Sequence, residues 1–134
     1  MQAMKDDVFK IKIFWIMCKH HCSLMDGWVP YPSTIIQRQI PNLSLYKVRK
    51  YLKELKQEGY IDSELYVDTS WDERPVLVRG YNLTSKGANT HLCDLAHERE
   101  RRICKECFDF DIGKASHTKK LIGNEFDDLD WLDE

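Results

Sequence analysis

The stretch that decides the fold is LSLYKVRKYLKELKQEGYI, residues 43–61. Apolar side chains recur at three- and four-residue spacing from Leu45 to Leu55, which is typical of an amphipathic helix. Ser44 is a suitable N-cap, and Gly59 suits the left-handed position beyond a helix end. The segment therefore predicts a helix that begins at Ser44 and ends at Gly59. Its apolar stripe consists of Leu45, Val48, Tyr51, Leu52 and Leu55.

The opposite face of this helix is basic. It carries two acids, Glu54 and Glu58, against five bases: Lys47, Arg49, Lys50, Lys53 and Lys56. Upstream, Ser33 is expected to cap a short helix over 34–40, which Pro41 ends. A three-residue turn then leads into the basic helix. Two helices joined in this way, the second longer and basic, indicate a helix-turn-helix.

The flanking segments complete an α+β pattern that is mostly helical. Residues 6–22 predict an N-terminal helix, and two prolines make 28–32 extended. Alternation over 61–68 and the run 75–83 predict a two-stranded hairpin with a polar loop at 69–74. A long helix is expected from Thr84 or Ser85 to about Phe108, followed by an acidic tail.

Two motifs resemble the winged helix-turn-helix regulators of bacteria and phage. Residues 43–61 are similar to the recognition helix and the strand start that follows it. GYNLTSKG, residues 80–87, is similar to the end of the wing in PadR- and MarR-like proteins. The resemblance covers about 5–107 and implies a winged-helix domain over 1–107. It also implies a sequence-specific double-stranded DNA-binding protein, a transcriptional regulator of bacterial, phage or mobile-element origin.

On that reading the DNA-contacting residues lie on the basic helix and at the hairpin. Lys and Arg side chains neutralise phosphates, and residues near the start of the helix reach base edges. The predicted set is Ser44, Tyr46, Lys47, Arg49, Lys50, Lys53 and Arg74. The alternative is a solvated helix face with ion pairs such as Lys50 with Glu54.

The hairpin departs from the pattern of a DNA-contacting wing because it is acidic. Five acids between 61 and 80 face only Arg74 and Arg79, and acids near phosphates repel. Trp71 in the hairpin loop is interpreted either as a contact to a DNA groove or to a partner, or as a lid folded on the core. The alternative function is therefore a winged-helix protein-interaction module, as in replication or in an anti-host phage factor.

Charge is distributed unevenly along the chain. Residues 108–134 hold eight acids and three lysines, which leaves 17 basic and 14 acidic residues for 1–107. The tail is expected to be flexible, and it interleaves acids with large apolar side chains. Phe126, Leu129 and Trp131 are predicted to bind a protein partner, to mask the basic helix, or to dock on the domain.

Cysteine and histidine patterns favour no metal, cofactor or catalytic site. Cys18, Cys22, Cys104 and Cys107 could form a zinc site if the first and last helices pack together, but both pairs lie on predicted helices, which favours buried free thiols. Five cysteines without a leader sequence suggest reduced thiols in the cytoplasm. Since no phosphate loop or catalytic motif is present, the chain is not predicted to be an enzyme.

The remaining expectations concern membranes and assembly. The longest apolar run, 13–18, is too short to span a bilayer. The N-terminal helix is nonetheless apolar nearly all round over Ile13–Met17. This segment and the helix 85–107 are therefore predicted to form a homodimer, which would place two recognition helices on one DNA site.

Overall fold

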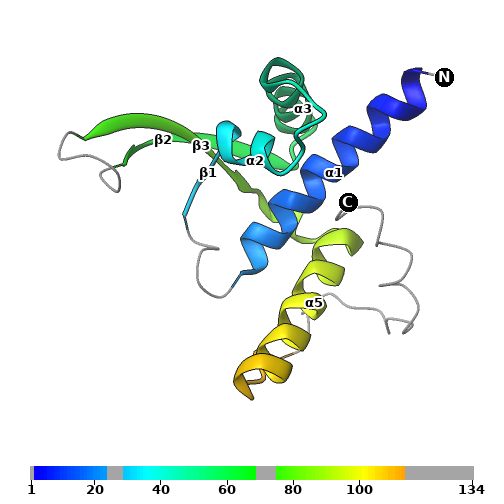
Figure 1. The fold of residues 1–134 in the computed structure, drawn as a ribbon, viewed down its shortest axis with the longest axis vertical. Coiled ribbons are helices and arrows are strands. Elements are labelled where there is room, and N and C mark those ends of the chain that lie inside the picture. Colours follow the sequence, from blue (N-terminus) through cyan, green and yellow to red (C-terminus); the bar gives the residue numbers. More distant parts are fainter. Residues whose placement is uncertain (1, 24–28, 69–74, 114–134) are drawn as a thin grey trace.

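The computed structural model describes residues 2–23, 29–68 and 75–113. It confirms an α+β fold that is mostly helical, with a small antiparallel sheet. The elements are α1 (Gln2–Cys22), β1 (Tyr31–Pro32), α2 (Ser33–Arg38), α3 (Leu45–Gln57), β2 (Ile61–Asp68), β3 (Val76–Leu83), α4 (Ser85–Ala88) and α5 (His91–Phe108). In Figure 1, α1 crosses the molecule between α3 and α5, and the β2–β3 hairpin extends away from the helices. Among the described helices, none has the length and apolar character that a bilayer crossing requires.

The core is built around the second half of α1. Every residue from Ile13 to Cys18 is at most 7% exposed. α1 packs against both α5 and α3, so the chain covers this helix on several sides by itself. The all-round apolar segment is therefore explained without a second subunit, and of the two surfaces on which the homodimer prediction depended, Ile13–Met17 is not free.

α3 forms as the pattern predicts. The Ser44 hydroxyl accepts a hydrogen bond from the backbone N–H of Lys47, which caps the helix. Gly59 has a φ of 86°, the left-handed conformation expected beyond the helix end. The buried residues of α3 are Val48, Tyr51, Leu52 and Leu55. These four side chains fix which face of α3 meets the core and which meets solvent.

The sheet has three strands, in the order β1-β3-β2, instead of the two that the sequence predicted. The extended segment before α2 pairs with β3, with Tyr31 opposite Tyr81 and Pro32 opposite Gly80. Pro32 lies on an edge strand, which is where a sheet tolerates proline. β1 thus attaches the start of α2 to the sheet.

The expected continuous helix over 85–108 is wrong, because the chain breaks at Asn89 and Thr90. The hydroxyl of Thr90 accepts from the backbone N–H of Cys93 and starts α5 anew. The short helix α4, which precedes the break, lies against the residue before β2. A Cβ on Gly87 of α4 would come within 2.1 Å of the Tyr60 carbonyl oxygen. The two backbones therefore approach each other closely just before the break.

Candidate nucleic-acid interface

A basic groove lies between α3, the start of α2 and one face of the sheet. Its volume is about 610 Å³, and the described residues that line it include four cations, three from α3 and one from β3, and no acid. The lining consists of Pro32, Ser33, Thr34, Arg49, Lys53, Lys56, Ser63, Leu77, Val78, Arg79 and Tyr81. We call this feature the basic groove.

Hydroxyl groups position three of the four cations. The Ser63 hydroxyl on β2 accepts from Lys56 Nζ of α3 at 2.8 Å and from Arg79 Nη1 of β3 at 3.1 Å. The Ser33 hydroxyl accepts from Arg49 Nε at 3.3 Å. Ser33 thus contributes to the groove. The prediction that Ser33 caps the short helix is wrong, because Pro32 occupies the N-cap position and Ser33 is the first residue of α2.

The cations of the basic groove keep their charge available for a ligand. Within residues 2–23, 29–68 and 75–113, no ion pair joins a groove cation to a carboxylate. The side-chain hydrogen bonds of Arg49, Lys56 and Arg79 are with neutral hydroxyls, which leave their positive charge uncompensated. Four such charges around one concave surface favour an anion such as a phosphodiester backbone.

Two acids of the hairpin, Asp62 and Glu64, lie on the other face of the sheet. Ser63 and Arg79 face the groove, and strand side chains alternate between faces, so Asp62 and Glu64 point away from it. Glu64 Oε1 accepts from Asn82 Nδ2 at 3.0 Å on that opposite face. The acidic composition of the hairpin therefore does not place these two carboxylates beside a phosphate in the groove.

The structure brings together only part of the predicted DNA-contacting set. Arg49 and Lys53 line the groove. Ser44 caps α3, and Tyr46 is 76% exposed at its start. The other lysines of the set, Lys47 and Lys50, lie on α3 outside the groove lining, and Arg74 lies outside the described residues.

Besides Tyr81, five polar groove residues were not in the predicted set: Ser33, Thr34, Lys56, Ser63 and Arg79. The spacing of Lys56 from Lys53 and Arg49 places the three on one side of α3 and could have indicated it. The two sheet residues could not be found this way, because their position depends on how the sheet packs beside α3.

The cysteines do not form the four-thiolate arrangement. Cys18 and Cys22 of α1 meet Cys93, at the start of α5. Cys104 is buried farther along α5, and Cys107 is exposed. In the described part of the chain, no group of three or more His, Cys, Asp or Glu side chains has the arrangement of a metal site.

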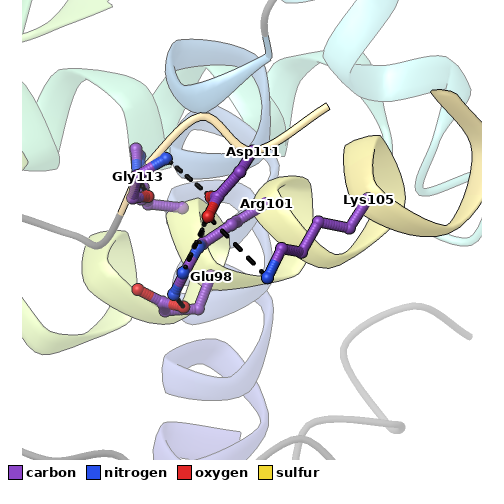
Figure 2. Close-up of polar contacts among 6 residues, drawn as sticks. Glu98, Arg101, Lys105, Asp111 and Gly113 are labelled. Carbon is purple, nitrogen blue, oxygen red and sulfur yellow. Dashed lines mark hydrogen bonds and ion pairs between the residues drawn. The ribbon is translucent and has the colours of Figure 1, made fainter. Parts of the chain in front are cut away.

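The chain beyond α5 folds back on that helix, as Figure 2 shows. Asp111 accepts two hydrogen bonds from Arg101, at 2.7 and 3.2 Å, and one from the backbone N–H of Gly113 at 2.9 Å. Lys105 Nζ lies 3.7 Å from the same carboxylate. Asp109, in the left-handed conformation, makes the reversal. Residues 109–113 of the predicted flexible tail are thus held, and its proposed partner-binding residues Phe126, Leu129 and Trp131 lie outside the described residues.

This fold-back is expected to open in acid. The hydrogen bonds from Arg101, followed by the one from Gly113, lower the pKa of Asp111 well below its usual value. A carboxylate with a lowered pKa stabilises the folded arrangement above its ordinary pKa, near 3.9, and this contribution is lost as the pH falls through the lowered value. Amide exchange of Gly113, measured by NMR, should therefore be faster in Asp111→Asn at neutral pH. Asp109→Asn, which removes a carboxylate outside these bonds, should leave the exchange unchanged, and equal rates in both variants would contradict the role of Asp111.

Comparison with known proteins assigns neither a family nor a function to this chain. No family model matches the chain, and neither the curated proteins nor the solved structures include a match. The function must therefore be inferred from the basic groove and the helices around it.

Proposed function

We propose that this protein is a winged-helix transcriptional regulator that binds double-stranded DNA with sequence specificity. The observation that carries the proposal is the basic groove, in which Arg49, Lys53, Lys56 and Arg79 line one concavity with no acid among the described lining residues. Phosphate contacts supply much of the affinity of such proteins and fix their register on the duplex.

The order of the elements supports the proposal. Helix, short strand, helix, turn, helix and hairpin follow each other as in the winged helix-turn-helix pattern, with α3 in the place of the recognition helix. A phosphate backbone in the basic groove would lie directly beside α3. The exposed face at the start of α3, with Tyr46 and Lys50, would then face the base edges of the adjacent major groove.

The hairpin geometry favours DNA over the alternative of a protein-interaction module. That alternative depended on the acids of the hairpin. Asp62 and Glu64 lie on the sheet face opposite the basic groove, so neither of these two carboxylates lies beside an anion that Arg79 would bind. The tail remains a candidate for binding a protein partner.

Homodimerisation also remains a proposal, but it needs another surface. Ile13–Met17 is buried within the chain. Large apolar side chains are exposed instead at Val8 and Ile11 on the outer part of α1, and at Phe108 and Phe110 around the end of α5. These positions are where a second subunit would find apolar surface to cover.

The test is the salt dependence of duplex binding. The full chain should bind duplex DNA at low salt, and the logarithm of its affinity should fall with the logarithm of salt concentration by about 0.9 per neutralised phosphate. Lys53→Gln should therefore flatten the slope by about 0.9. Arg102→Gln, on the exposed side of α5, is the control and should leave the slope unchanged. If the full chain binds no duplex at low salt, the proposal is wrong.

A further inference from the structure

Three thiols meet where the end of α1 packs on the start of α5. Cys22 Sγ lies 3.7 Å from Cys93 Sγ, and Cys18 hydrogen-bonds Cys93 as well. Cys18 and Cys22 are one turn apart on α1, so both face the same point on α5. The contact therefore joins residues that are 71 positions apart in the sequence.

We propose that Cys22 and Cys93 form a reversible dithiol–disulfide site that is oxidised by peroxides. The two sulfurs need to approach from 3.7 Å to the S–S bond length of about 2.05 Å. Cys22 is the last residue of α1, where a helix end adjusts more easily than its middle. It is also partly exposed, which gives a small oxidant access to the otherwise buried pair.

The surroundings favour Cys93 as the attacking thiolate. It lies in the first turn of the 18-residue helix α5, where backbone N–H groups favour negative charge. Hydrogen bonds from Cys18 and Cys22 lower the pKa of Cys93 to about 3, with His21 and His97 acting in the same direction. The hydrogen bond to Cys93, together with burial, raises the pKa of Cys22 and keeps that thiol protonated.

The chemistry balances with hydrogen peroxide as the oxidant. The Cys93 thiolate attacks one peroxide oxygen, the O–O bond breaks, and the leaving hydroxide takes up a proton to become water. The sulfenic acid on Cys93 is then attacked by the Cys22 sulfur, which forms the S–S bond and releases a second water. Two thiols lose two electrons and two protons, and peroxide is reduced to two waters.

Disulfide chemistry suits this cluster better than metal binding. The thiols of Cys22 and Cys93 are already within hydrogen-bond distance of each other. That separation would also fit two thiolates on one tetrahedral zinc ion, but among the described residues no group of three or more His, Cys, Asp or Glu side chains has the arrangement of a metal site. None of the three cysteines lines the basic groove, so the site does not depend on the proposed DNA-binding function.

The experiment uses the full chain carrying Cys107→Ser, which removes the one cysteine that is exposed among the five. The protein is treated with hydrogen peroxide, remaining thiols are alkylated, and peptides are mapped without reduction. The expected product is a monomeric chain with a Cys22–Cys93 cross-linked peptide, lighter by two hydrogen atoms and restored by dithiothreitol. Its melting temperature should rise by roughly 10 °C, because the bond closes a long loop.

Two variants test the assignment of the pair. Cys104→Ser, which removes a buried thiol outside the cluster, should oxidise like the parent, whereas Cys22→Ser should form no cross-link and show no rise in melting temperature. Lys53→Glu should oxidise normally even where it fails to bind DNA. A Cys18–Cys93 cross-link in the parent, oxidation of Cys93 to sulfinic acid without a cross-link, or retention of all thiols would each overturn the proposal.

Discussion

Charge reversal on both walls of the basic groove, Lys53→Glu with Arg79→Glu, should weaken duplex binding by about 100-fold or more at low salt. Lys53 projects from α3 and Arg79 from β3, so the double variant removes two phosphate contacts from opposite sides and adds two repelling charges. Fluorescence anisotropy with a labelled duplex measures the loss. The loss should shrink as salt is added, because screening weakens attraction and repulsion alike.

The control for this variant carries the same change in net charge elsewhere. Arg102→Glu with Lys105→Glu alters the exposed side of α5, outside the groove lining. It should retain nearly all of the affinity, and both proteins should show the same helical content by circular dichroism. Equal losses in the two variants would mean that net charge, and not the groove, governs binding.

Lys50→Glu separates the groove from the exposed face of α3. Lys50 lies on α3 outside the groove lining, and it is one of the residues proposed to reach base edges. Its reversal should weaken binding and also reduce the preference for one sequence over another, because base contacts carry specificity. Competition between related duplexes measures this preference.

The largest expected loss of stability from a single methyl group is at Gly87. In Gly87→Ala the new Cβ would lie 2.1 Å from the Tyr60 carbonyl oxygen and 3.1 Å from its carbonyl carbon. Backbone atoms cannot move aside as the end of a flexible side chain can, so α4 would have to separate from the start of β2. We expect the free energy of unfolding to fall by about 3 kcal/mol or more, measured by urea denaturation.

Gly59→Ala is the matched comparison, since it adds the same methyl group at a position where the methyl group is unfavourable for a different reason. A Cβ there meets only the end of the Lys86 side chain, at 3.6 Å, but the φ of 86° is unfavourable for alanine. The expected loss is about 1 kcal/mol. A Gly87→Ala variant no less stable than Gly59→Ala would contradict the close approach of α4 to Tyr60.

Local sequence patterns predicted α3 and its surroundings well. The stripe that includes Val48 and Leu52 is buried, Ser44 caps the helix, and Gly59 is left-handed. The hairpin forms over the residues expected. These features depend on contacts within four residues or between adjacent strands, so periodicity and cap chemistry are sufficient to find them.

The same reasoning was wrong where a distant segment decided the local structure. Thr84 and Thr90 are both good N-caps, and the sequence does not say that each begins a separate helix. Just before the break between α4 and α5, Gly87 packs against Tyr60, which lies 27 residues earlier. Likewise, Tyr31 and Pro32 become a strand only because β3 has a free edge beside them.

Short-range periodicity was thus sufficient to predict the mostly helical α+β class, the basic face of α3 and the hairpin. Only the tertiary structure placed Arg79 and Ser63 opposite Lys56 and turned the neighbouring acids to the far face of the sheet. The same is true of the contact between Cys22 and Cys93. The composition gives the number of charges and thiols but not the distances between them. Those distances depend on the packing of α3 beside the sheet and of α1 on α5.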